Sequence, residues 1–341
     1  MVHPRVTLDS HVDIPWPSRN DFCADSNRAV DIPKLQRGGI NAVCFAAYVP
    51  QGPRNSAGTQ RAGERTLAML EEIRTMAAMP GMTYATDVAE IRAASARGDI
   101  AVLAAVENGT ALGDNPDLIE EFSALGVRYV TLTHNGHNAL ADAAIPRRDL
   151  GDSDIEHDGL SPLGLMMIKR MNDHGIIIDI SHASKRTMMQ AAKLSRAPVV
   201  ATHSCVRALC DHPRNLDDEQ LRAIRDVGGV IQITLVPGFL RPNAKAAEVS
   251  VNSVVDHIQY VIDIIGISHV GIGTDFDGGG GIAGCASAAE LPALTAALRA
   301  RGYPEDAIEQ IWGGNFLRTL EAAESAAIHL NPCAGVSSRS V

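Results

Sequence analysis

Apolar runs of strand length recur along the chain, and segments with the spacing of helices separate them. The runs are rich in Val and Ile and mostly lack alternation of polar and apolar residues. Strands buried on both faces have this pattern, which predicts a parallel sheet. The runs are LDSHVDI (8–14), NAVCFAAYV (41–49), IAVLAAVENG (100–109), VRYVTLTH (127–134), GIIIDISHAS (175–184), PVVATHS (198–204), GGVIQITLV (228–236) and HVGIGTDFDG (269–278).

The segments between these runs contain helices with recognisable ends. In residues 161–175, Ser161 can cap a helix, Pro162 suits its first turn and Gly175 suits its end. Residues 251–266 have apolar side chains at helical spacing and also end at a glycine. Eight strands alternating with helices predict an α/β fold, a single (β/α)8 TIM-like barrel. An open doubly wound sheet is the alternative, but no GxGxxG motif follows the first run.

The chain has no linker-like change of composition and no internal repeat. We therefore expect one barrel domain over residues 1–329 and a flexible tail at 330–341. Residues 136–160 are expected to form a long loop after the fourth strand, and long loops of this kind often serve function.

Composition excludes several classes of protein. The net charge of −10 has the wrong sign for binding nucleic acid, and 4% aromatic residues offer few stacking platforms. The first residues lack the pattern of a secretory signal and no apolar run is long enough to span a membrane, so we expect a cytoplasmic protein without a membrane partner. Six cysteines without CxxC spacing predict free thiols, and Cys205 is expected to be a small packing residue.

Polar side chains with ligand chemistry fall at the ends of the predicted strands. Barrel enzymes build their sites at the carboxyl ends of the strands, so these side chains are expected to share one rim. The residues concerned are His11, Asp13, Glu107, His134, His182, His203, Asp275 and Asp277.

Imidazoles and carboxylates without a cysteine ligand suit zinc or a similar metal in a hydrolytic site. Two metals need a bridging group, and Glu107 is a carboxylate that could bridge them. A pair of ions about 3.5–4 Å apart would hold a hydroxide and polarise a carbonyl oxygen. Asp275 is then placed to move the proton to the leaving group.

Ordered motifs over most of the chain, residues 7–322 approximately, resemble the renal or membrane dipeptidases. These are zinc peptidases (peptidase family M19) among the amidohydrolase-like barrels, so the resemblance implies that the domain over residues 1–329 is of the metallo-dependent hydrolase type. The motif GIGTDFDG (271–278) also fits barrel amidohydrolases in general. The motifs are DSHVDIPW (9–16), VENG (106–109), RYVTLTHN (128–135), LSPLG (160–164), IDISHAS (178–184), SRAPVVATHS (195–204), HPRNLDD (212–218) and GIGTDFDG (271–278).

The resemblance implies two zinc ions per chain. His11 and Asp13 match ligands of one zinc, Glu107 matches the bridging carboxylate, and His182 and His203 match ligands of the second zinc.

The resemblance also implies roles toward the substrate. His134 matches a histidine that contacts substrate and helps to stabilise the tetrahedral intermediate. Arg214 resembles the arginine that binds the terminal carboxylate, for which its fork of donors is suited. Asp275 resembles the residue that positions the attacking water and moves its proton.

Some assignments stay open on the sequence alone. His134 could be a metal ligand, and Arg207 is a rival of Arg214 for the carboxylate. Asp277 is expected to be a turn residue or to support a ligand, and Asp9 is expected to cap or orient a ligand. Two further histidines, His137 and His157, are expected to be exposed in the long loop without a role.

The chain departs from the family pattern after the seventh strand. Family members commonly have an asparagine and an aromatic residue there, whereas this chain reads ITLVPGFL with Thr234 and Val236. This difference leaves open how the pocket reads the substrate. The cysteine framework and membrane anchor of the animal enzymes have no counterpart.

Together these features predict a metal-dependent dipeptidase. It would hydrolyse small dipeptides with a metal-bridging hydroxide. The resemblance implies that L-Xaa-D-Xaa dipeptides are among them and suggests a homodimer. One alternative is an amidohydrolase acting on N-acyl amino acids, lactams or lactones. A second is a non-catalytic, metal-containing barrel that only binds a ligand.

Overall fold

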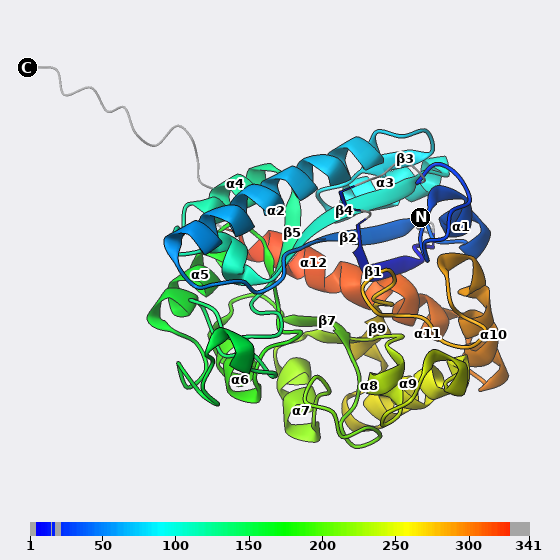
Figure 1. Cartoon of the computed structure of the whole chain (residues 1–341). Helices are drawn as coiled ribbons and strands as arrows, with labels where there is room; N and C mark the ends of the chain where they lie inside the picture. The colour runs from blue at the N-terminus through cyan, green and yellow to red at the C-terminus, as the bar shows by residue number, and fades with distance from the viewer. Residues whose placement is uncertain (1–4, 15, 18–21, 328–341) are drawn as a thin grey trace, which may run out of the picture.

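Parallel strands form the centre of the chain and helices surround them (Figure 1). The computed structural model describes residues 5–14, 16–17 and 22–327. Among these residues the strands are β1 (Leu8–Asp13), β2 (Ala42–Tyr48), β3 (Met82–Tyr84), β4 (Ile100–Glu107), β5 (Val127–Thr131), β6 (Ile177–Asp179), β7 (Val200–Ser204), β8 (Val230–Ile233) and β9 (Val270–Ile272).

Eight of the strands follow one another around a nearly closed barrel in the order β1-β2-β4-β5-β6-β7-β8-β9. They coincide with the eight runs predicted from the sequence, so the TIM-like barrel is confirmed. The sequence analysis missed β3, which pairs with the first residues of β4 (Met82 with Ile100). β3 uses the edge of β4 that β5 leaves free, because β5 joins β4 only from Ala104 onward.

The barrel closes between β1 and the segment that follows β9. The Asp275 amide donates to the His11 carbonyl (3.0 Å), and the Asp13 amide donates to the Phe276 carbonyl (3.1 Å). The buried Asp9 carboxylate also accepts hydrogen bonds from the amide and hydroxyl of Thr274 (2.9 and 2.6 Å). Asp9 therefore joins β1 to the segment after β9, and its Oδ1 also accepts from the backbone amide of His11 (3.3 Å), which agrees with the expected role in capping or orienting a ligand.

The two helices predicted above end as capping chemistry indicates. Ser161 accepts from the Gly164 amide at the start of α5, and Gly266 ends α9. The helices are α1 (Ile32–Gly38), α2 (Ser56–Ala77), α3 (Val88–Arg97), α4 (Leu118–Ala124), α5 (Pro162–Asp173), α6 (Lys185–Leu194), α7 (Asp218–Asp226), α8 (Pro237–Leu240), α9 (Val251–Ile265), α10 (Pro292–Ala300), α11 (Glu305–Glu309) and α12 (Asn315–Ala326). Short 3-10 or π turns are η1 (Gly109–Leu112), η2 (Arg148–Leu150), η3 (Ala246–Glu248), η4 (Ile267–His269), η5 (Ala288–Glu290) and η6 (Gln310–Gly314).

One of two hydrophobic clusters fills the barrel near the starts of its strands. Ala101 and Leu103 of β4 pack there with Phe316 and Leu320 of α12. This packing blocks one end of the barrel and leaves the carboxyl ends of the strands for a site.

The predicted long loop lies between β5 and α5, and His137 helps to order it. The prediction of an exposed His137 is wrong, since its side chain is fully buried. Its Nδ1 accepts from the Ala143 amide (3.0 Å), and its Nε2 lies 3.0 Å from the Ser153 carbonyl. His157 is half-buried, with Nε2 2.9 Å from the Asn138 carbonyl. Both rings fasten the loop to itself.

In the described part of the chain, no helix is both long and apolar enough to cross a membrane. The cysteines described there are free thiols, and Cys205 is buried as expected. The predicted tail, residues 330–341, lies outside the described residues. The cytoplasmic location and the homodimer stay predictions.

Candidate metal centre

Glu107 stands at the centre of the predicted site, at the carboxyl end of β4. Side chains alternate along a strand, so Glu107 lies on the face that Ala101, Leu103 and Ala105 present to the barrel interior. Asn108 follows with a φ of 86°, and this left-handed turn ends the strand. The Glu107 side chain is buried, with 5% of its surface exposed.

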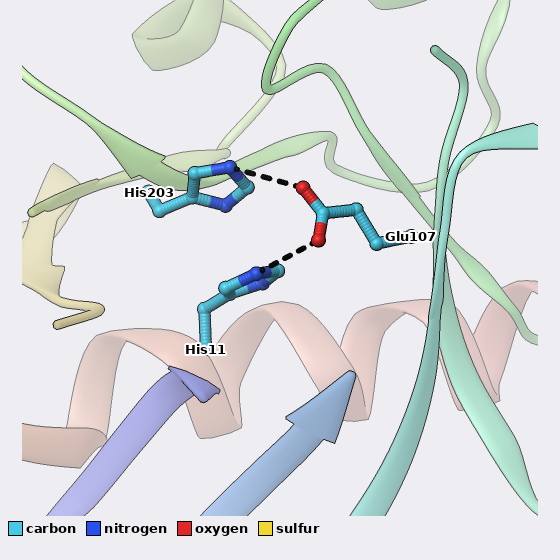
Figure 2. Close-up of side chains that lie close together, drawn as sticks. All are labelled: His11, Glu107 and His203. Carbon is cyan, nitrogen blue, oxygen red and sulfur yellow. Dashed lines mark ion pairs between the residues drawn. The ribbon is translucent and has the colours of Figure 1, made fainter. Parts of the chain in front are cut away.

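The two oxygens of the Glu107 carboxylate face different histidines. Oε2 lies 3.4 Å from His11 Nε2, whereas Oε1 lies 3.2 Å from His182 Nε2 and 3.5 Å from His203 Nε2. Figure 2 shows His11 and His203 aimed at opposite oxygens of this carboxylate. Glu107 thus joins residues that come from β1, β7 and the loop after β6.

The other predicted ligand, Asp13, lies in the same cluster. Its Oδ1 is 3.9 Å from His11 Nε2, and Asp275 Oδ1 is also 3.9 Å from that nitrogen. The rings of His11 and His203 are 3.9 Å apart, and those of His182 and His203 are 5.0 Å apart. All five predicted metal ligands therefore meet at one place.

The donor set fits metal ions. Three buried atoms in the cluster have no hydrogen-bond partner in the structure: His11 Nε2, His203 Nε2 and Asp13 Oδ1. Leaving buried polar atoms unpaired is costly, so such atoms indicate a missing partner. Three triads have ligand atoms close enough to share an ion: His11–Glu107–His203, Glu107–His134–His182 and His11–Asp13–Asp275. These triads share residues with the two predicted ligand sets, His11–Asp13–Glu107 and Glu107–His182–His203, but none of them is identical to either set.

Burial and charge set the protonation of the histidine ligands. Burial holds the pKa of His182 and of His203 well below its ordinary value, so both rings are neutral at neutral pH, as metal ligands must be. Burial also lowers the pKa of His11, but the charges of Glu107, Asp275 and Asp13 outweigh burial and raise it to about 10. Without metal, a proton on His11 therefore offsets part of the negative charge.

The carboxylates respond in opposite directions. Burial would raise the pKa of Glu107, but the positive charge of His11 close by holds it well below its ordinary value. The pKa of Asp13 is raised well above its ordinary value by burial and by the negative charge of Glu107. Cations at this place would relieve the repulsion between the two carboxylates.

In His11, His182 and His203, the Nδ1 atom, which points away from Glu107, lies within hydrogen-bond distance of an oxygen atom. The Tyr129 hydroxyl lies 2.8 Å from His11 Nδ1 and donates its own proton to the Ser10 carbonyl (2.9 Å). His11 Nδ1 must then be the donor, so Nε2, which faces Glu107, is the nitrogen that could bind a metal ion once it gives up its proton. Asn135 Oδ1, 3.1 Å from His182 Nδ1, has the same effect on His182.

His203 is oriented through a relay that ends at Asp179. The Thr202 hydroxyl donates to Asp179 Oδ2 (2.7 Å) and lies 2.9 Å from His203 Nδ1. The single hydroxyl proton of Thr202 is donated to Asp179, so His203 Nδ1 must be the donor in its hydrogen bond with Thr202. Asp179 also accepts from the Thr131 hydroxyl (2.6 Å), so this relay is firmly placed.

Replacing Thr202 with valine is expected to weaken zinc binding about 10- to 100-fold, because His203 loses the acceptor that fixes its tautomer. Competition with a chromophoric chelator would measure this affinity. The control Thr202→Ser keeps the hydroxyl and is expected to bind zinc as the parent does. Equal affinity in the valine variant would mean that the relay does not orient His203.

His134 lies beside the cluster, at the wall of a cavity of 260 Å³. Its Nε2 is 3.9 Å from Glu107 Oε1, farther than the nitrogens of His11, His182 and His203. Its side chain is 21% exposed, and burial lowers its pKa to about 4, so the ring is neutral at neutral pH. This position favours a substrate contact over a metal ligand. The cavity is lined by Asp13, Tyr48, Glu107, His134, Asn135, His182, Arg214, Val236, Phe239, Asp275, Gly278 and Gly279.

Arg214 lines this cavity, whereas its rival Arg207 does not. Arg214 is buried, its Nη2 donates to the His203 carbonyl (3.1 Å), and its guanidinium lies 5.3 Å from the centre of the Phe239 ring. Burial lowers its pKa to about 10, so it stays charged at neutral pH. Arg207 instead lies near the exposed Asp211 (3.6 Å).

Asp275 lines the same cavity on a strained turn. It has a φ of 59°, and Asp277 has a φ of 62°; left-handed backbone of this kind is uncommon for residues other than glycine. Gly278 packs directly against two carboxylates of the site. A Cβ there would lie 2.4 Å from Asp275 Oδ1 and 3.0 Å from Asp13 Oδ2, so a larger residue would not fit. Asp277 points away and accepts from the amides of Ala29 and Val30, which is a turn role.

Several residues of the site escaped the sequence analysis. Tyr48 and Phe239 line the cavity, and Tyr129 and Asp179 hold the histidines. Tyr48 is the last residue of β2, and a polar side chain at a strand end is the same signal that identified the other rim residues, so it could have been found. Tyr129 and Asp179 lie within apolar runs, where the sequence gives no sign of the face on which they lie.

Comparison with known proteins gives matches to dipeptidases over most of the chain. The family model for membrane dipeptidases (peptidase family M19) matches residues 1–332. Dipeptidase verJ of Clonostachys rogersoniana is 31% identical over 341 residues, which cover 95% of this chain and 85% of that protein. Dipeptidase aclJ of Aspergillus oryzae is 34% identical over 307 residues, covering 87% and 71%.

Solved structures match over nearly the whole chain. The probable dipeptidase PvdM of Pseudomonas aeruginosa superposes with a TM-score of 0.91 at 28% identity, covering 95% of this chain and 96% of that one. A metallopeptidase of Rhodobacter sphaeroides, liganded with a phosphinate mimic of the dipeptide L-Ala-D-Ala, gives a TM-score of 0.84 at 28% identity, covering 94% and 99%.

Proposed function

This chain belongs to the membrane dipeptidase family, peptidase family M19, and from that premise we propose that it hydrolyses small dipeptides, including L-Xaa-D-Xaa dipeptides, at a binuclear zinc site. The family assignment makes it a metal-dependent dipeptidase. The observation that supports two ions most directly is the division of the Glu107 oxygens between His11 on one side and His182 and His203 on the other.

In this proposal one zinc ion is held by His11, Asp13 and Glu107, and the second by Glu107, His182 and His203. Imidazole and carboxylate donors without thiolate suit catalytic zinc. When bound, the two ions would supply a water of lowered pKa and a Lewis acid for the scissile carbonyl. The unpaired buried atoms of His11, His203 and Asp13 support these ligand sets.

The chain's own residues then bind the dipeptide and move the proton. Arg214 receives the terminal carboxylate, and His134 donates a hydrogen bond to the oxygen of the carbonyl under attack. Asp275 accepts a proton from the attacking water and passes it to the leaving amine nitrogen. Burial raises the pKa of Asp275 to about 7, which suits a group that both takes and gives a proton near neutral pH.

Tolerance of a D-residue is proposed for the carboxyl-terminal position. The carbonyl under attack belongs to the amino-terminal residue, so the stereocentre of the second residue lies outside the reacting group. The phosphinate mimic of L-Ala-D-Ala in the Rhodobacter sphaeroides relative supports this part of the proposal.

Release of free amino acids from L,L and L,D dipeptides, compared with N-acetyl amino acids, tests the proposal. We expect cleavage of both dipeptide classes and weak or no cleavage of N-acetyl amino acids. Cleavage confined to N-acetyl amino acids would contradict the dipeptidase proposal in favour of another amidohydrolase. A protein that holds zinc and binds dipeptides without cleaving them would indicate a non-catalytic barrel.

Replacing Arg214 with methionine is expected to cost about 2 kcal/mol, which lowers kcat/KM for dipeptides roughly thirtyfold, mainly through KM. The parent is expected to prefer a free terminal carboxylate over a terminal amide, and the variant to lose this preference. Steady-state kinetics on both substrates measures it. The control Arg207→Met is expected to keep the preference, and its loss in the control alone would reassign the role to Arg207.

A further inference from the structure

A second cavity of 200 Å³ adjoins the candidate metal centre. Asp13 and Tyr48 line both cavities, whereas Arg214 lines only the first. The dipeptide's terminal carboxylate belongs at Arg214, so its amino-terminal residue lies toward the wall that the two cavities share. The second cavity is therefore placed to receive the side chain of that residue.

Two arginines line this second cavity, and neither is fully paired. Arg65 of α2 is half-buried and makes no ion pair or side-chain hydrogen bond within the described part of the chain, and its buried Nε has no partner. Arg28 lies 3.3 Å from Asp277 through Nη2, but its Nε is also buried without a partner. Buried guanidinium donors without acceptors indicate a place for an anionic group.

Two carboxylates, Asp13 and Asp277, and two guanidinium groups line the second cavity, and zinc bound to Asp13 would leave one positive charge in excess. Asp277 faces Arg28, and it also accepts two backbone hydrogen bonds. Asp13 belongs to the proposed zinc site, where a cation offsets its charge. Arg65 then remains without a counter-charge among the described residues, and the apolar side chains of Trp16 and Met69 complete the cavity beside it.

We propose that this second cavity binds the carboxylate side chain of an amino-terminal Glu or Asp of the dipeptide, with Arg65 as its main partner. The inference rests on the proposed function and names the substrate class of the same site. A carboxylate can accept from guanidinium Nε and Nη together, which is the donor set that Arg65 presents.

The test compares kcat/KM for L-Glu-L-Ala and for L-Gln-L-Ala, which differ in charge but hardly in shape. We expect the parent to favour the glutamate substrate about tenfold, since a charge-assisted hydrogen bond is worth roughly twice a neutral one. The variant Arg65→Gln is expected to bring this ratio close to one. Arg61→Gln, an exposed arginine four residues earlier on the same helix, is the matched control and is expected to keep the parent ratio.

The outcomes separate this inference from the proposed function. A parent ratio of one or less, with both dipeptides cleaved, would overturn the acidic subsite and leave the dipeptidase proposal standing. A preference that survives in Arg65→Gln would also overturn it, since another group would then read the charge. If Arg65→Gln folds poorly, Arg65→Lys replaces it in the test. The lysine keeps the positive charge, so this variant is expected to retain part of the preference. Failure to cleave any dipeptide would contradict the proposed function itself.

Discussion

Replacing Glu107 with glutamine is expected to lower kcat/KM for dipeptides by at least about a thousandfold. Glu107 is the only residue of the cluster whose two oxygens face both histidine sets. An amide offers one oxygen and one NH2 group, so it cannot bridge two cations. Loss of metal removes several kcal/mol of transition-state stabilisation, and each 1.36 kcal/mol or so is tenfold in rate. Zinc per chain should fall together with activity.

Zinc content and steady-state kinetics on the same preparations check this expectation. The control Glu120→Gln makes the same change on the exposed surface of α4 and is expected to keep both zinc and activity. A Glu107→Gln protein with two zinc ions and parental kcat/KM would show that Glu107 does not bridge.

Replacing Asp275 with asparagine is expected to lower kcat by about 100- to 10,000-fold, the range of general acid–base catalysis. Asp275 must be ionised to accept the proton from water. Burial raises its pKa to about 7, and bound cations would shift it downward by attraction. The kcat of the parent should therefore fall as the pH drops through the pKa of Asp275, below 7. This fall is the acidic limb of the pH–rate profile, and Asp275→Asn should lack it.

Asp277→Asn is the matched control for this experiment. Asp277 has nearly the same left-handed backbone as Asp275, with φ values of 62° and 59°, and asparagine tolerates that conformation. Its carboxylate accepts from the amides of Ala29 and Val30 and lies near Arg28, and it lines the second cavity but not the first. We expect Asp277→Asn to keep the acidic limb. A full limb in Asp275→Asn would assign the proton transfer to another group.

The barrel was predictable because its strands are buried on both faces. Val, Ile and Ala fill runs such as residues 100–106, and this pattern is specific for parallel sheets. β3 was not predictable in the same way, since three residues (Met82–Tyr84) give too little pattern and pair only because β4 offers a free edge. Burial of His137 likewise depends on how the long loop folds back on itself.

The rim residues were predictable from one rule, the position of polar side chains at strand ends. That rule gave the residues around Glu107, whereas Arg214 lies beyond the end of β7 and came only from the resemblance of the HPRNLDD motif to the family. It could not give Tyr129 or Asp179, which hold His11 and His203 from inside apolar runs. Arg65 was also beyond reach, because a helix surface does not reveal which arginine turns toward a cavity.

In a binuclear zinc dipeptidase, zinc content and dipeptide hydrolysis must be lost together and restored together. Zinc per chain is measured by elemental analysis together with hydrolysis of L-Ala-L-Ala and L-Ala-D-Ala, before chelation, after chelation and after zinc is restored. We predict close to two zinc ions per chain, with cleavage of both dipeptides that chelation abolishes and zinc restores. A protein that binds no zinc and cleaves neither dipeptide after zinc is added would contradict the account.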